Sequence, residues 1–178
     1  SGFTQEAGPD VYYAYQKLSE QALSTRGEPL AGVILDLRGN PGGLLSSAVD
    51  ISSLFVPKGS DLVSAQGRGF RGVLYRSTGE PVRDPAKVSL GVLVNSGTAS
   101  AAEIVSGAVQ DLDVGVVIGQ DKTFGKGLVQ NVETLPYNTA LKYTVAKYYT
   151  PSGRCIQAVN YADNGGGRKG KDAAPVVG

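Results

Sequence analysis

The chain has 178 residues, with 17 basic and 16 acidic side chains and a formal net charge of +1. Its length allows one domain with a substantial core, and its near neutrality argues against a nucleic-acid or anionic-membrane partner. We find no apolar run of about 18 residues and no signal peptide, so we expect no transmembrane segment. Cys155 is the single cysteine, which excludes an internal disulfide and a cysteine-based zinc site, and we expect neither metal nor cofactor.

The first third of the chain predicts a helix, a strand and a second helix. Helical spacing of apolar residues covers 10–24, with Asp10 as the expected N-cap. Residues 30–38 form a continuous apolar run, which is typical of a parallel strand buried on both faces. A glycine loop at 39–43 then leads into helical spacing over 44–55. This loop resembles a phosphate-binding loop, but it lacks the Lys-Ser/Thr pair of a P-loop and the spacing of a dinucleotide fingerprint.

The rest of the chain predicts strands around one further helix, 100–112. The expected strands are short apolar or alternating runs at 62–65, 73–75, 88–94, 115–119, 128–135 and 140–149. The first two and the last two should pair as antiparallel hairpins. From residue 161 the composition changes to Gly, Lys, Asp and Ala, so we expect a core at 1–160 and a flexible tail at 161–178. The alternation of strands and helices predicts an α/β fold with a mostly parallel central sheet and flanking helices.

One serine stands where a predicted strand passes into a predicted helix. The hydroxyl of Ser100 would face unpaired backbone N–H groups and the positive end of the helix dipole. This setting suits a nucleophile whose transition state carries negative charge. Ser100 and Glu103 also form the pattern of a capping box, so this motif alone favours a structural role as a helix cap.

A second segment, 122–130, supplies a candidate base. The chain contains no histidine, so a Ser-His-Asp triad is excluded, and a lysine base is the known variant. Lys126 lies between two glycines in this segment. Free lysine has a pKa of about 10.4, so a lysine base needs desolvation. We expect Thr123, Phe124 and Gly125, together with Leu128 and Val129, to provide that apolar setting.

Three segments, 32–43, 94–103 and 123–130, together resemble the carboxyl-terminal processing proteases, the tail-specific serine peptidases of bacteria and plastids. They follow the order found in that family, and the resemblance covers about residues 1–157. It implies a crotonase- or Clp-protease-like core and an endopeptidase that cleaves near the C-terminus of protein substrates. Family members also carry a PDZ domain that captures substrate C-termini, and we expect this chain to hold the catalytic core without it. By analogy alone, the compartment would be the periplasm or the thylakoid lumen.

The resemblance also implies roles for individual residues. Ser100 is the expected nucleophile and Lys126 the expected general base, while Gln130 matches the residue that orients the lysine. The remaining matches are two oxyanion-hole amides and two acidic supporting positions: Gly43 and Ala101, and Glu103 and Asp111.

Two alternatives stay open at this point. A ligand-binding protein can share this core without proteolysis, as retinoid-binding repeats do, although an intact Ser100, Lys126 and Gln130 argue against it. An inactive fragment of a protease would keep the site but need further segments for turnover. Crotonase-type acyl-CoA chemistry is disfavoured because no second carboxylate site is evident. We expect Asp36 and Arg38 to form an ion pair at a strand end rather than to take part in chemistry.

Overall fold

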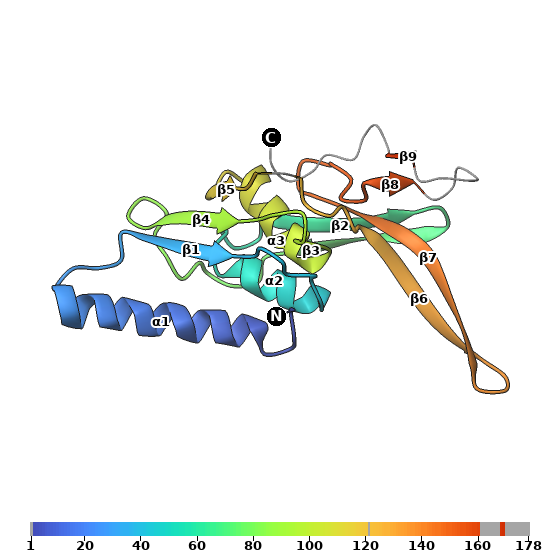
Figure 1. The fold of residues 1–178 in the computed structure, drawn as a ribbon, viewed down its shortest axis with the longest axis horizontal. Coiled ribbons are helices and arrows are strands. Elements are labelled where there is room, and N and C mark those ends of the chain that lie inside the picture. The colour runs from blue at the N-terminus through green and yellow to red at the C-terminus, as the bar shows by residue number, and fades with distance from the viewer. Residues whose placement is uncertain (1, 121, 161–167, 170–178) are drawn as a thin grey trace.

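The computed structural model describes residues 2–120, 122–160 and 168–169 (Figure 1). The fold is α/β, as predicted. A three-stranded sheet has the order β1-β4-β5, a four-stranded sheet has the order β3-β2-β7-β6, and β8 pairs with β9. The helices are α1 (Ala7–Arg26), α2 (Leu45–Ser53) and α3 (Ala101–Asp111). The strands are β1 (Gly32–Asp36), β2 (Asp61–Gly67), β3 (Phe70–Arg76), β4 (Ser89–Leu93), β5 (Val116–Ile118), β6 (Leu128–Leu135), β7 (Thr139–Tyr149), β8 (Val159–Asn160) and β9 (Arg168–Lys169).

The first helix is longer than its sequence pattern predicted. It begins at Ala7 rather than at residue 10, so Asp10 lies inside the first turn and is not the N-cap. Pro9 does not prevent this, because the N–H that proline lacks would have no acceptor in the first helical turn. Gly27 ends the helix in the left-handed conformation, with a φ of 71°. The helix lies along one side of the molecule and packs against α2 (Figure 1).

The strands predicted at 30–38 and 88–94 form and are neighbours in one sheet. Strands β1 and β4 are parallel, with Ile34 opposite Gly91, and β5 runs parallel on the other side of β4. Leu90 and Val92 of β4 point into the main core, where they join Ile51 of α2 and Ile104 of α3. These two helices therefore cover one face of the parallel sheet.

The opposite face of the parallel sheet is exposed, which corrects the expectations that 30–38 is buried on both faces and that 115–119 is a buried strand. Ile34 is 71% exposed, Val116 64% and Ile118 52%. Parallel strands are buried on both faces only where other elements cover both of them. Among the described residues, α2 and α3 pack on one face only, and continuous apolar runs alone could not show this.

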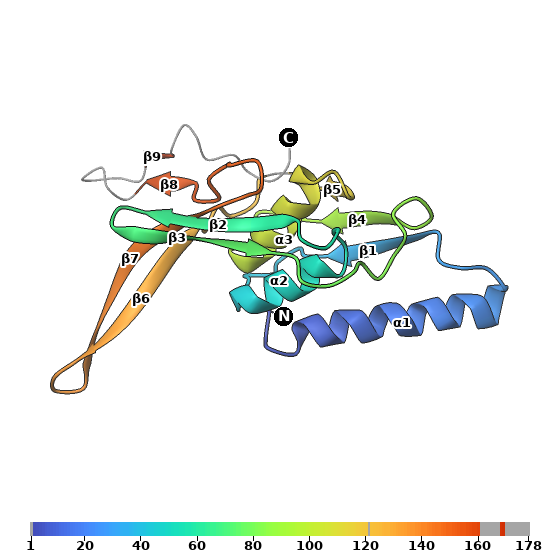
Figure 2. The same cartoon turned by 180° about the vertical axis from the view of Figure 1, so that it is seen from behind.

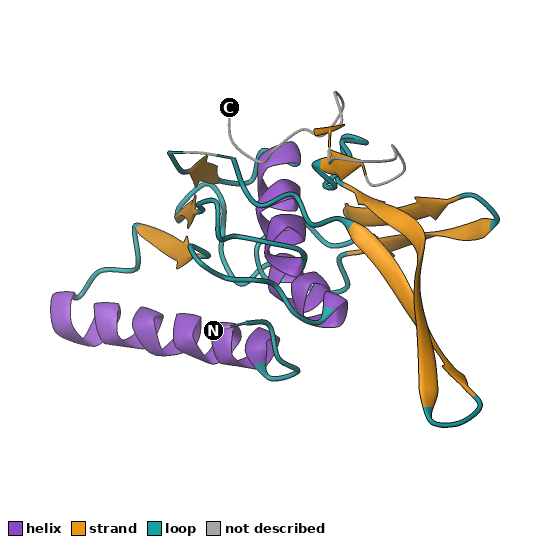
Figure 3. Cartoon of the chain, turned by 45° about the vertical axis from the view of Figure 1, so that its right-hand side comes forward, coloured by secondary structure: helices purple, strands orange, loops and turns teal. Residues whose placement is uncertain are grey.

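Both predicted hairpins form. Strands β2 and β3 are antiparallel, and so are β6 and β7, while β2 also pairs with the end of β7. The β6–β7 hairpin projects from the body of the molecule (Figures 2 and 3), and its tip residue Tyr137 is 96% exposed. The end of the hairpin opposite its tip lies against the body, and the segment 122–127 leads directly into β6 there.

The predicted flexible tail, 161–178, lies outside the described residues except for Arg168–Lys169, which form β9. None of the helices in the described ranges is long and apolar enough to cross a bilayer.

Candidate active site

Ser100 occupies a strained turn between β4 and α3. Its φ is 56° and its ψ is −120°, a conformation that costs a residue other than glycine on the order of 1–3 kcal/mol. The capping box predicted with Glu103 is present, and the Ser100 N–H donates to Glu103 Oε2 at 2.8 Å. Ala101 is the first residue of α3, so its N–H has no acceptor within the helix. The turn thus combines a helix cap with a strained strand-turn-helix geometry, which in hydrolases of another fold exposes a nucleophilic serine.

The glycine loop packs directly against the Ser100 turn. Gly42 has a φ of 87°, and a Cβ built on it would lie 2.7 Å from the Ala101 nitrogen and 2.8 Å from Ser100 Cβ. The loop is also bonded to the turn, because the Asn40 carbonyl accepts the Ala99 N–H at 2.9 Å. Asn40 Oδ1 in turn accepts the Gly42 N–H at 2.9 Å. Only glycine fits this approach of one backbone to another.

Gly43, a predicted oxyanion donor, follows directly on the residue that touches Ser100. It lies in a parallel bridge with Phe3, in which Phe3 N–H donates to the Gly42 carbonyl at 2.8 Å and Leu44 N–H donates to the Phe3 carbonyl at 3.0 Å. These two bonds do not use the Gly43 N–H. The structure therefore brings the loop that carries Gly43 beside Ala101 at the start of α3. The role of their two N–H groups in an oxyanion hole stays a prediction.

Two polar residues that the sequence reasoning did not single out join the ends of β1 and β4. Asn95 Oδ1 accepts the N–H groups of Gly39 at 2.9 Å and Gly97 at 3.0 Å. Thr98 is fully buried, and its hydroxyl donates to the Leu37 carbonyl at 2.8 Å. The only signal in the sequence was the position of these residues between a strand end and the serine. Their contacts hold the glycine loop and the serine turn in one arrangement.

Glu103 joins the serine turn to the lysine segment. Its side chain is buried, with 1% exposure of the residue, and its carboxylate accepts four hydrogen bonds. Oε1 accepts from the Thr123 hydroxyl at 2.6 Å and the Gly125 N–H at 2.7 Å. Oε2 accepts from the N–H groups of Ser100 at 2.8 Å and Lys126 at 2.9 Å. A buried carboxylate is tolerated when donors surround it, so Glu103 acts as a rigid connection between the two segments.

The side chain of Lys126 is exposed, which corrects the expectation of an apolar setting. Along this segment burial alternates: Thr123, Gly125 and Gly127 are buried, whereas Lys126 is exposed and Phe124 is 62% exposed. Backbone groups of the exposed residues also bind the body, since the Phe124 N–H donates to the Thr98 carbonyl at 2.9 Å and the Lys126 N–H to Glu103. The main chain is therefore fixed while the side chains of Phe124 and Lys126 are exposed.

Gln130 lies in β6, opposite Thr144, and is exposed. The register of the two strands shifts here, because Val129 pairs with Ala146 and Gln130 with Thr144, which leaves Val145 of β7 as the extra residue. The assignment of Gln130 as the residue that orients Lys126 stays a prediction.

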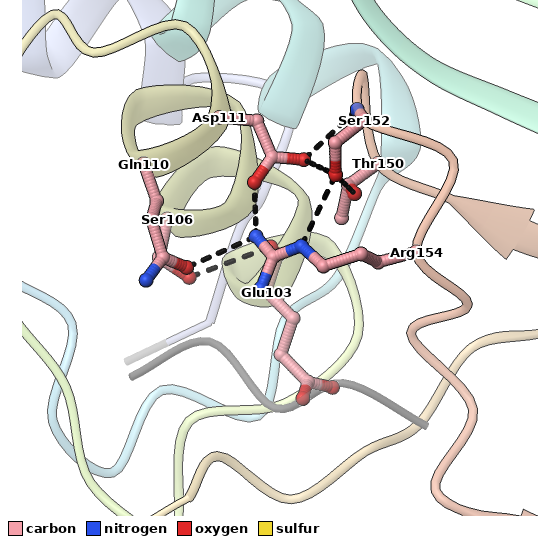
Figure 4. Close-up of polar contacts among 7 residues, drawn as sticks. All are labelled: Glu103, Ser106, Gln110, Asp111, Thr150, Ser152 and Arg154. Carbon is pink, nitrogen blue, oxygen red and sulfur yellow. Dashed lines mark hydrogen bonds and ion pairs between the residues drawn. The ribbon is translucent and has the colours of Figure 1, made fainter. Parts of the chain in front are cut away.

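Asp111 lies at the opposite end of α3 from Ser100, about 16 Å away along the helix axis at the usual rise per residue. The structure therefore does not bring this predicted supporting residue to the serine. In Figure 4 the Glu103 carboxylate also points away from Asp111 and its partners. Glu103 is the only one of the two predicted acidic positions that contacts the candidate site within the described part of the chain.

Asp111 instead fastens the end of α3 to the turn after β7. Its side chain is 4% exposed, pairs with Arg154, and accepts the Ser152 hydroxyl at 2.6 Å and the Ser152 N–H at 3.0 Å. Burial acts to raise the pKa of Asp111, but the hydrogen bonds from Ser152, Thr150 and Arg154 outweigh it and hold the pKa below its usual value. This cluster is a structural clamp (Figure 4).

The predicted ion pair between Asp36 and Arg38 is confirmed. Arg38 donates to both carboxylate oxygens, through Nε at 2.9 Å and Nη2 at 2.7 Å. These hydrogen bonds lower the pKa of Asp36 to about 2. The pair lies at the end of β1, where the chain enters the glycine loop. Over the described ranges, no three His, Cys, Asp or Glu side chains gather as a metal site would require.

The sequence profile of peptidase family S41 matches residues 1–164. The chain is 40% identical over 151 residues to the carboxyl-terminal-processing protease of Synechocystis, an alignment that covers 85% of this chain and 33% of that protein. It is 39% identical over 158 residues to the carboxy-terminal-processing protease of Bartonella bacilliformis, covering 88% and 35%. The solved photosystem II D1 C-terminal processing protease superposes with a TM-score of 0.76 at 35% identity, over 88% of this chain and 38% of that one. The chain spans about a third of the length of the curated relatives it matches.

Proposed function

Because this chain belongs to peptidase family S41, we propose that it carries the catalytic site of a serine endopeptidase, with Ser100 as nucleophile and Lys126 as general base. The observation that supports this most directly is the shared carboxylate of Glu103. One oxygen of that carboxylate binds the main chain of Ser100 and of Lys126, which lie far apart in the sequence. A cap alone would not need a connection to an exposed lysine between two glycines.

The proposed reaction follows from this arrangement. The neutral Lys126 amine takes the hydroxyl proton while Ser100 Oγ attacks the scissile carbonyl carbon. The N–H groups of Ala101 and Gly43 stabilise the oxyanion, and the α3 N-terminus adds its partial positive charge. The tetrahedral intermediate then expels the amine, which takes a proton from the Lys126 ammonium. Water then attacks the carbonyl carbon of the resulting ester and gives a proton to the same lysine. The bond from that carbon to Ser100 Oγ breaks, Oγ takes the proton back from the ammonium, and the acid product leaves.

The exposed setting of Lys126 gives the substrate a part in this reaction. Only the neutral form of an amine can act as a base. A polypeptide that lies over Phe124 and Lys126 would displace water from the lysine amine. It would also cover the side chain of Phe124, which is 62% exposed. We therefore propose a polypeptide as the substrate, and cleavage near its C-terminus, as the names of the two relatives indicate for those proteins.

A serine-directed fluorophosphonate tests the proposed function. We expect it to modify Ser100 in the wild-type chain, as located by peptide mass spectrometry, and to leave the Ser100→Ala variant unmodified. Equal modification of both proteins, or none of either, would contradict the assignment of Ser100 and favour a ligand-binding protein on the same core. Modification of Ser100 without any cleavage of an unstructured polypeptide would correspond to a site that needs further segments for turnover.

A further inference from the structure

Side chains bind three consecutive N–H groups around Lys126. Glu103 accepts those of Gly125 and Lys126, and Gln157 Oε1 accepts that of Gly127 at 2.8 Å. This segment has no regular secondary structure, so its buried donors need acceptors from elsewhere in the chain. The two acceptors come from different places, one from α3 and one from the chain after the turn that follows β7.

The chain that carries Gln157 runs along the lysine segment. In this return segment, residues 155–158, the Ala158 N–H donates to the Gly125 carbonyl at 3.0 Å. The neighbouring Tyr148 N–H donates to the Gly127 carbonyl at 2.8 Å. The packing is close, because a Cβ on Gly125 would lie 2.2 Å from Ala158 Cβ. The two residues that flank Lys126 are thus both hydrogen-bonded to neighbouring chain: Gly125 to the return segment and Gly127 to β7.

We propose that Gln157 is a positioning residue for the general base, acting on Lys126 through the Gly127 N–H; this inference rests on the proposed function. Gln157 is 7% exposed, so loss of its oxygen would leave a buried donor without an acceptor and displace the segment. Displacement of a catalytic group by about 1 Å can slow a reaction on the order of 100-fold. Gln157 acts on the geometry of the base and does not touch substrate.

The choice of an amide at this position has an electrostatic reason. Glu103 already places one carboxylate on the Lys126 N–H. A second carboxylate one residue further along would favour the charged ammonium form of the lysine. Gln157 accepts the Gly127 N–H with a neutral oxygen, and so it holds the backbone without adding negative charge near the amine.

Two substitutions separate the contribution of the Gln157 acceptor oxygen from that of its neutral charge. Gln157→Met keeps the approximate volume but removes the acceptor, and Gln157→Glu keeps the acceptor but adds charge. Gln21→Ala, at an exposed glutamine of α1, is the control. For each protein we would measure the rate of fluorophosphonate modification of Ser100 between pH 6 and pH 10 and the hydrogen exchange of the Gly127 amide.

We expect Gln157→Met to slow modification by about 10- to 100-fold and to speed exchange of the Gly127 amide. We expect Gln157→Glu to keep that amide protected and to move the rise of the modification rate to higher pH. Gln21→Ala should match the wild type in both measurements.

A folded Gln157→Met variant that reacts at the wild-type rate, or keeps the Gly127 amide protected, would overturn the inference. If Gln157→Met does not fold, Gln157→Glu decides alone, and an unchanged pH dependence overturns the inference. Failure of the proposed function looks different: wild-type Ser100 then does not react at all. In that case exchange of the Gly127 amide still shows whether Gln157 anchors the segment, and the claim about the base is overturned.

Discussion

Oε2 of Glu103 accepts the backbone N–H of Lys126 at 2.9 Å, although the two residues lie 23 positions apart. The same oxygen accepts the Ser100 N–H at 2.8 Å. The first turn of α3 and the lysine segment are therefore joined through one buried side chain. Any change in that side chain should alter the position of Lys126, the proposed base, relative to Ser100, the proposed nucleophile, as well as the stability of the fold.

Glu103→Gln should both destabilise the chain and slow modification of Ser100. An amide supplies one acceptor oxygen where the carboxylate supplies two, and its NH₂ group would face N–H donors. Two buried donors would lose their acceptor, at a cost of about 2–4 kcal/mol. Urea unfolding and the rate of fluorophosphonate modification measure the two effects. Glu20→Gln, at an exposed position of α1, is the control and should change neither; a Glu103→Gln variant that behaves like it would contradict the proposed connection.

Lys126→Ala and Lys126→Arg should abolish modification of Ser100 and leave stability within about 0.5 kcal/mol of the wild type. The side chain is exposed, so its loss removes little packing. Arginine stays protonated at any working pH and cannot take the hydroxyl proton. The exposed Lys122→Ala variant serves as the control. Persistent reactivity of both Lys126 variants would place the base elsewhere, and Lys122 would be the first candidate.

Two glycines in the same loop offer a matched pair. Gly39 has a φ of 66° with no atom within 4 Å of a built Cβ, whereas the Cβ of an alanine at Gly42, with a φ of 87°, would lie 2.6 Å from the Ala99 carbonyl oxygen. Gly39→Ala should therefore cost only about 1–2 kcal/mol, the strain of the left-handed conformation, and keep Ser100 reactive. Gly42→Ala should cost more and abolish the reaction. Equal losses of stability and reactivity in the two variants would show that the loop does not approach Ser100 as closely as described.

Asp111→Asn should weaken the fold in a pH-dependent way and leave Ser100 reactive. The pKa of Asp111 is lowered in the folded chain, so its contribution to stability is present above the unfolded value of about 3.9 and is lost as the pH falls through the folded value. We expect a deficit of about 2 kcal/mol at pH 7 that decreases below about pH 4, measured by urea unfolding. Asp113→Asn, at an exposed aspartate nearby, should show no such dependence. A deficit that is the same at pH 7 and pH 3 would argue against an ionised Asp111 in the clamp.

The sequence by itself determined the elements of this fold and the place of the serine. Apolar spacing located three helices, the strands 30–38 and 88–94, and the two hairpins, because each depends on residues close together in the chain. The turn before α3 was also predictable, since Ser100 and Glu103 are three residues apart. The resemblance to one peptidase family came from three short segments that each have a local pattern.

Only the tertiary structure decided what surrounds those elements. Ile34 lies in an apolar run, yet it is 71% exposed, because burial of a strand depends on which helices cover the sheet. Lys126 is exposed for a related reason: its neighbouring glycines, and not its side chain, bind the body of the molecule. The contact of Gln157 with Gly127 joins residues 30 positions apart. Local patterns do not specify which distant side chain accepts a buried backbone N–H, because that choice is made only when the segments pack together.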